Sequence, residues 1–176
     1  IGFDHWCISI AAAHRGEVIA AVIYQPTTGI LYRADETGAY RNGERMRVLQ
    51  APVAQGVFST SYPSARRGGE GAALGFLRLV METRSVRRPG STALSLAEVA
   101  AGHFLGTFNK ATHPWDVAAG ILLMQRAGGV YLGFDDVDDS DDALLAKAAA
   151  MTGIDRRLLV HEEFAARILP TLRGQP

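Results

Sequence analysis

Turn-forming residues divide the first fifty positions into strand-length runs, and this pattern leaves few folds open. Turns are expected at residues 14–16, 25–29, 35–38 and 42–43. The runs between them are apolar or alternate in polarity, and Asn42-Gly43 is the pair that a type I′ turn favours. We therefore expect an antiparallel meander from Trp6 to Val48. Its run from Val18 to Tyr24 is apolar on both faces, which predicts an inner strand covered on both sides.

From Val57 onward the pattern changes to alternating strands and helices. Strands are expected near residues 57–61, 84–88, 104–108, 130–134 and 148–152, and helices near 70–82, 91–101, 115–127 and 161–172. This order predicts a mixed α/β (layered α+β) fold, with an antiparallel meander sheet followed by a mixed sheet layer. We expect residues 1–50 to be the remainder of an N-terminal sheet subdomain and residues 51–176 a C-terminal α/β subdomain.

Composition limits the partners of the chain. Eighteen lysines and arginines balance eighteen acids, so no overall field attracts nucleic acid or a membrane surface. No apolar run is long enough to span a bilayer. The single Cys7 cannot form an intrachain disulfide and reads as a buried structural thiol, which favours a cytoplasmic location. The chain starts at Ile1 without Met, and we expect the encoded N-terminus to lie upstream.

The helix expected at 91–101 is apolar nearly all round but has a polar entrance. Gly90, Ser91 and Thr92 offer free backbone N–H groups, a hydroxyl and the positive end of the helix dipole. Such an entrance can bind an anion or a polyol. The alternative is that Ser91 only caps its own helix, and local sequence leaves both explanations open.

The helix expected at 115–127 carries one acid, Asp116, near its start in an otherwise apolar segment. A carboxylate there needs a cation, hydrogen bonds or water to offset its desolvation. Asp116 either binds a cation or caps its own helix, and spacing alone favours neither.

Other polar groups give weaker signals. No two of the five histidines have a metal-binding spacing, so we expect surface or packing roles for them. The acidic run 135–142 lacks the central Gly and terminal Glu of a calcium loop and is expected to be a solvated loop.

Three segments considered together resemble a known family. Residues 90–102, 114–120 and 127–129 resemble the C-terminal signature of the inositol monophosphatase family, and the order of the meander elements is similar as well. The resemblance implies a sandwich of alternating helix and sheet layers. It also implies that Asp116 is a ligand of a catalytic divalent metal, usually Mg²⁺, and that Gly90, Ser91 and Thr92 line the pocket for substrate hydroxyls.

The chain departs from the family pattern in two functional places. The Glu-Glu pair and the Asp-Pro-x-Asp-Gly-Thr segment, which supply the other metal ligands, are absent from these 176 residues. Asp4 is not taken as a replacement metal ligand. Asn109 stands where inositol-handling members often have a Glu that contacts a substrate hydroxyl, so it is a substrate-binding candidate. Sugar phosphates, histidinol phosphate and nucleotide-derived phosphates remain open as substrates.

The expected function is Mg²⁺-dependent hydrolysis of a phosphate monoester of a polyol or sugar by metal-activated water. The alternative is a phosphatase-like scaffold with a regulatory role, binding a protein or the RNA machinery, and little catalysis. The resemblance further implies a homodimer and inhibition by lithium. Without the upstream metal ligands, these 176 residues alone are expected to be inactive.

Overall fold

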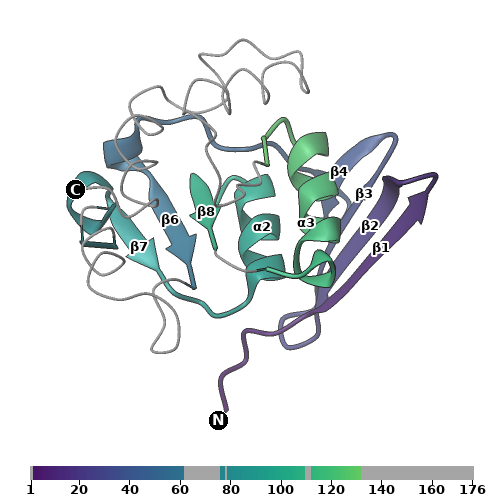
Figure 1. Ribbon diagram of the computed structural model, residues 1–176, viewed down its shortest axis with the longest axis horizontal. Helices are drawn as coiled ribbons and strands as arrows, with labels where there is room; N and C mark the ends of the chain where they lie inside the picture. Colours follow the sequence, from purple (N-terminus) through teal and green to yellow (C-terminus); the bar gives the residue numbers. More distant parts are fainter. Residues whose placement is uncertain (1, 62–75, 78, 110–111, 132–176) are drawn as a thin grey trace.

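Two sheets enclose a pair of helices in the computed structural model of the chain (Figure 1), which describes residues 2–61, 76–77, 79–109 and 112–131. One sheet is antiparallel with five strands and the other is parallel with three strands. The mixed α/β architecture expected from the sequence is therefore confirmed.

The meander forms the five-stranded sheet, with neighbouring strands paired in chain order. Its strands are β1 Ile8–His14, β2 Glu17–Gln25, β3 Ile30–Asp35, β4 Gly38–Arg41 and β5 Glu44–Arg45. The four expected turns lie between these strands. At the last of them Asn42 and Gly43 have φ values of 49° and 89°, as a type I′ turn requires.

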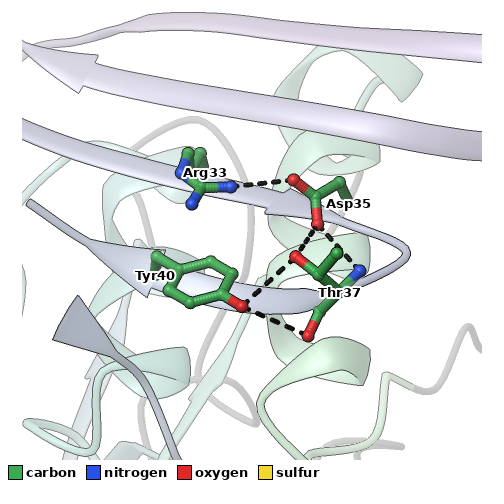
Figure 2. A network of polar contacts seen from close by, with 4 residues as sticks. All are labelled: Arg33, Asp35, Thr37 and Tyr40. Atoms are coloured by element: carbon green, nitrogen blue, oxygen red, sulfur yellow. Dashed lines mark hydrogen bonds and ion pairs between the residues drawn. The ribbon is translucent and has the colours of Figure 1, made fainter. Parts of the chain in front are cut away.

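Polar side chains close the turn between β3 and β4 (Figure 2). Asp35 Oδ2 lies 2.8 Å from Arg33 Nη1, and Asp35 Oδ1 accepts hydrogen bonds from the backbone N–H and the hydroxyl of Thr37. Tyr40 donates to the Thr37 carbonyl at 3.3 Å. The Thr37 hydrogen bonds, followed by the charge of Arg33, lower the pKa of the Asp35 carboxyl.

Only one face of the five-stranded sheet is covered in the part of the chain that the structure describes. Ala21 and Ile23 of β2 face the core and are buried. On the opposite face Ile10 is 60% exposed and Leu31 is 37% exposed. β2 is an inner strand as predicted, but the second covering layer expected for it is not found among the described residues.

The parallel sheet has the order β7-β6-β8. Its strands are β6 Val57–Thr60, β7 Ser85–Arg87 and β8 Gly106–Phe108, each within a range expected from the sequence. A short 3₁₀ helix, Val53–Gln55, precedes β6, and residues 76–77 and 79–82 are helical. The expected strand 130–134 is not formed at 130 and 131, and its remainder lies outside the described residues.

Helices α2 (Thr92–Ala100) and α3 (Pro114–Arg126) run side by side between the two sheets (Figure 1). Gly120 allows their close approach, because a Cβ there would lie 2.5 Å from Leu96 Cβ. Leu94, Leu96 and Leu123 join Ile23 in one core between the helices and the five-stranded sheet. The subdomain boundary near residue 50 stays a prediction, since this core draws on both sides of it.

Four predictions fall outside the described residues. They are the acidic loop 135–142, the strand 148–152, the helix 161–172 and most of the helix 70–82.

Candidate functional site

The carboxyl ends of the parallel strands bring three polar residues to one edge of the sheet. Ser61 follows β6, Arg88 follows β7 and Asn109 follows β8. Arg88 Nη2 donates to the carbonyl of Ser61 at 3.4 Å, and Asn109 also contacts Ser61. Ligands bind at this edge in open parallel sheets, because loops and helix N-termini converge there. The edge is therefore the place to look for a substrate site.

Asn109 is held by two hydrogen bonds from one residue. Its Oδ1 accepts from the backbone N–H of Ser61 at 2.8 Å and from the Ser61 hydroxyl at 2.6 Å. These bonds join positions 48 residues apart. They are possible because β6 and β8 are parallel neighbours, with Thr60 paired to Phe108.

Ser91 caps the start of α2, which is one of the two explanations that the sequence left open for this residue. Ser91 Oγ accepts from the backbone N–H of Leu94 at 3.4 Å, and Gly90 just before it has a φ of 88°. Cys7 Sγ lies 3.8 Å from the same hydroxyl oxygen. Ser91 and Thr92 are partly exposed and Gly90 is exposed, so capping leaves these groups accessible from solvent.

Asp116 lies in the first turn of α3 and also has a capping bond. Its Oδ2 accepts from the backbone N–H of His113 at 3.0 Å. The other carboxylate oxygen has no hydrogen-bond donor within the described part of the chain, and the residue is partly exposed. Capping therefore occupies one oxygen and leaves one that could face a cation, so the two explanations do not exclude each other.

The described residues contain no group of three or more His, Cys, Asp or Glu side chains that could hold a metal ion. One free carboxylate oxygen suits a hard cation such as Mg²⁺, which prefers oxygen ligands. Asp116 fits as one such ligand. A complete coordination shell needs further oxygen ligands from outside the described residues.

A polar cluster beside α2, buried at Tyr32 and exposed at His103, was missed at the level of sequence. The Tyr32 hydroxyl donates to Glu98 Oε1 at 2.6 Å, and Glu98 Oε2 contacts His103 Nδ1. Burial, followed by the Glu98 contact, raises the pKa of Tyr32 well above its usual range. Glu98 is the only acid within an apolar helix, which was a usable signal, but its partner on β3 is 66 residues away.

Two groups near the N-terminus are shaped mainly by burial. Burial lowers the pKa of His5, partly opposed by the charge of Glu98, and His5 Nε2 has no hydrogen-bond partner in the described structure. Burial raises the pKa of Cys7 despite the Ser91 contact. A thiol with a raised pKa is a poor nucleophile, and Cys7 is partly buried rather than fully buried as expected, so its structural role stays a prediction.

Comparison with known proteins connects this arrangement to a family. The family model described as "Inositol monophosphatase family" matches residues 1–173. The chain belongs to the inositol monophosphatase family.

Two curated relatives carry different names. An inositol-1-monophosphatase of Rhizobium meliloti is 42% identical over 131 residues, which are 73% of this chain and 49% of the relative. A protein of Xylella fastidiosa named Nus factor SuhB is 37% identical over 140 residues, 78% of this chain and 51% of that protein. The chain thus spans about half the length of these relatives.

Solved structures of the inositol monophosphatase family share the fold. The extragenic suppressor protein suhB of Bartonella henselae has a TM-score of 0.68 and 35% identity, covering 72% of this chain and 50% of that one. An IMPase of Thermotoga maritima has a TM-score of 0.72 and 26% identity, covering 94% of this chain and 61% of that one.

No helix in the described ranges is long and apolar enough to cross a membrane.

Proposed function

We propose that the protein hydrolyses a phosphate monoester of a polyol or sugar with the help of Mg²⁺. The observation that carries this proposal is Asp116. In a chain of the inositol monophosphatase family, this first-turn acid keeps one carboxylate oxygen without a hydrogen-bond donor among the described residues. An unpaired anionic oxygen beside an apolar helix is stabilised by a bound cation.

The residues would divide the work as follows. Asp116 holds the metal, while Gly90, Ser91 and Thr92 at the start of α2 bind substrate hydroxyls, and Asn109 contacts the substrate from the end of β8. Bound Mg²⁺ supplies an activated water and offsets charge on the leaving oxygen. No residue of the chain needs to form a covalent bond to phosphate.

The test is phosphate release by the complete encoded protein on a panel of inositol, sugar, histidinol and nucleotide-derived phosphates, with and without a chelator. We expect turnover of at least one substrate that stops on chelation and returns with Mg²⁺. Lithium should inhibit it. Turnover that survives chelation, or no turnover on any substrate, would contradict the proposal.

A second candidate function is a regulatory scaffold. It is favoured by relatives named Nus factor SuhB at 35–37% identity to this chain. Binding to a regulatory protein or to the RNA machinery that persists in Asp116→Asn, together with no hydrolysis by the unmutated protein, would favour this role over catalysis.

We also propose, with the same family as support, that the protein is a cytoplasmic homodimer in which residues 1–50 and 51–176 are subdomains. Sedimentation equilibrium of the complete protein checks the dimer, cell fractionation the location, and limited proteolysis the boundary near residue 50.

A further inference from the structure

The orientation of the Asn109 amide is fixed by chemistry. A backbone N–H can only donate, so the Asn109 atom that faces the N–H of Ser61 at 2.8 Å has to be the amide oxygen. The Ser61 hydroxyl, 2.6 Å from the same oxygen, occupies a second position on it. A carbonyl oxygen has two lone pairs, and Ser61 uses both.

The rest of the amide is therefore a pure donor. The Asn109 nitrogen has two N–H groups, and no acceptor contacts it within the described ranges. Asn109 is partly exposed at the carboxyl edge of the parallel sheet. The Asn109 amide therefore offers hydrogen-bond donors at this edge, where a carboxylate would offer acceptors.

We propose that Asn109 is a specificity-determining residue that selects phosphate monoesters bearing a second, anionic oxygen group, such as a carboxylate or another phosphate, and disfavours those bearing an ammonium group. This inference rests on the proposed function. An anionic group accepts from both amide N–H groups, and hydrogen bonds to charged groups are among the stronger ones. An ammonium group has only donors and would leave the amide nitrogen facing a donor.

The decisive variant is Asn109→Asp in the complete encoded protein. The carboxylate keeps an oxygen for the two Ser61 donors and replaces the NH₂ group by an anionic acceptor of nearly the same size. We compare kcat/KM with Mg²⁺ for 6-phosphogluconate and fructose 1,6-bisphosphate, which carry an anionic group, with glucosamine 6-phosphate, which carries an ammonium. Glucose 6-phosphate is the neutral reference.

The measured quantity is the ratio of kcat/KM for each anionic substrate to kcat/KM for the ammonium substrate. We expect Asn109→Asp to lower this ratio by at least about tenfold, mainly through KM, which is the size expected for loss of one hydrogen bond to a charged group. The two anionic substrates separate the carboxylate from the second phosphate as the preferred group. Asn109→Ala, which removes both donors without adding charge, should lower the ratio by a smaller factor.

Asn42→Asp is the matched control. Its Oδ1 also accepts from a backbone N–H, that of Leu31 at 2.8 Å, but it lies in the turn between β4 and β5. This variant should leave the ratio unchanged. A purely structural role of Asn109 would lower all four rates together and leave the ratio unchanged, and that result overturns the inference. Metal-dependent turnover with an unaltered ratio overturns the inference alone, whereas no turnover on any substrate overturns it together with the proposed function.

Discussion

At the scale of single residues, the capping bond of Asp116 is compatible with the metal-binding role proposed for it. One carboxylate oxygen satisfies the backbone N–H of His113, and the other has no donor in the part of the chain that the structure describes. The capping bond fixes the side chain, and a fixed carboxylate loses less conformational freedom on binding a cation. The cap would therefore prepare the residue for the proposed metal binding.

The observed cap and the proposed metal binding together predict that two substitutions at position 116 separate stability from activity. Asp116→Asn keeps an oxygen for the His113 N–H, so its free energy of unfolding should change little, whereas Asp116→Ala loses the cap at a cost of about 0.5–2 kcal/mol. Both should lower Mg²⁺-dependent phosphate release by roughly a hundredfold or more. Urea denaturation and phosphate-release assays measure the two effects. Equal stability of both variants would show that the cap contributes nothing.

At the scale of elements, β3 is joined to α2 through a side-chain hydrogen bond and to β4 through its turn. Tyr32 connects β3 to Glu98 on the helix, and Asp35 closes the turn at the end of the same strand (Figure 2). The pKa of Tyr32 is raised, which disfavours its charged form, and the pKa of Asp35 is lowered, which favours its charged form. The strand should therefore lose stability at both extremes of pH.

The Tyr32 contact predicts a fall in stability at alkaline pH. The pKa of Tyr32 is raised in the folded protein, so its contribution is complete below roughly pH 10, the unfolded value, and is lost as pH rises above that. Tyr32→Phe should make the decline of unfolding free energy above pH 10 less steep, measured by urea denaturation. Tyr24→Phe, on the exposed face of the sheet, should keep the slope of the unmutated protein.

The lowered pKa of Asp35 predicts a loss of stability at acid pH. Its pKa is lowered in the folded protein, so its stabilisation is present above the unfolded value near roughly pH 4 and is lost as pH falls through the folded value. Asp35→Asn should be less stable than the unmutated protein at neutral pH. In thermal denaturation, its Tm should fall less steeply as the pH is lowered below about 4. Glu36 lies in the same turn but has no hydrogen bond in the described contacts, so Glu36→Gln should keep the acid dependence of Tm of the unmutated protein.

How much could be predicted from sequence depended on the range of the interaction. The turn at Asn42-Gly43 and the helix after Ser91 were predicted correctly, because their signals are local. The contact between Ser61 and Asn109 could not be predicted, because it depends on the pairing of two distant strands. The two explanations for Asp116 stayed open for a different reason, since a local cap and a metal ligand need the same residue type at the same place.

At the scale of the whole molecule, the proposed site draws on residues that lie far apart in the sequence. Asn109 and Ser61 come from neighbouring strands of the parallel sheet, whereas Ser91 and Asp116 come from the starts of adjacent helices. A ligand bound by residues of both groups would hold the sheet and the helices in place. Binding should therefore be visible in the stability of the entire protein.

We predict that Mg²⁺ stabilises the complete encoded protein against heat. A ligand that binds only the folded state adds about 2.7 kcal/mol at one hundred times its Kd. For a protein of this order of size, that is a rise in Tm of roughly 5–10 °C. Differential scanning calorimetry at increasing Mg²⁺ measures it, and Asp116→Asn should remove most of the rise. An equal rise in both proteins would place the binding elsewhere.

The bond from the Ser61 backbone to Asn109 has an evolutionary consequence. The backbone N–H of Ser61 would survive replacement by any residue except proline, whereas the hydroxyl that also holds the amide oxygen would be kept only by serine or threonine. At position 109, one base change converts an asparagine codon into an aspartate codon. A lineage could thus reverse the polarity of this edge in one step while its scaffold stayed the same.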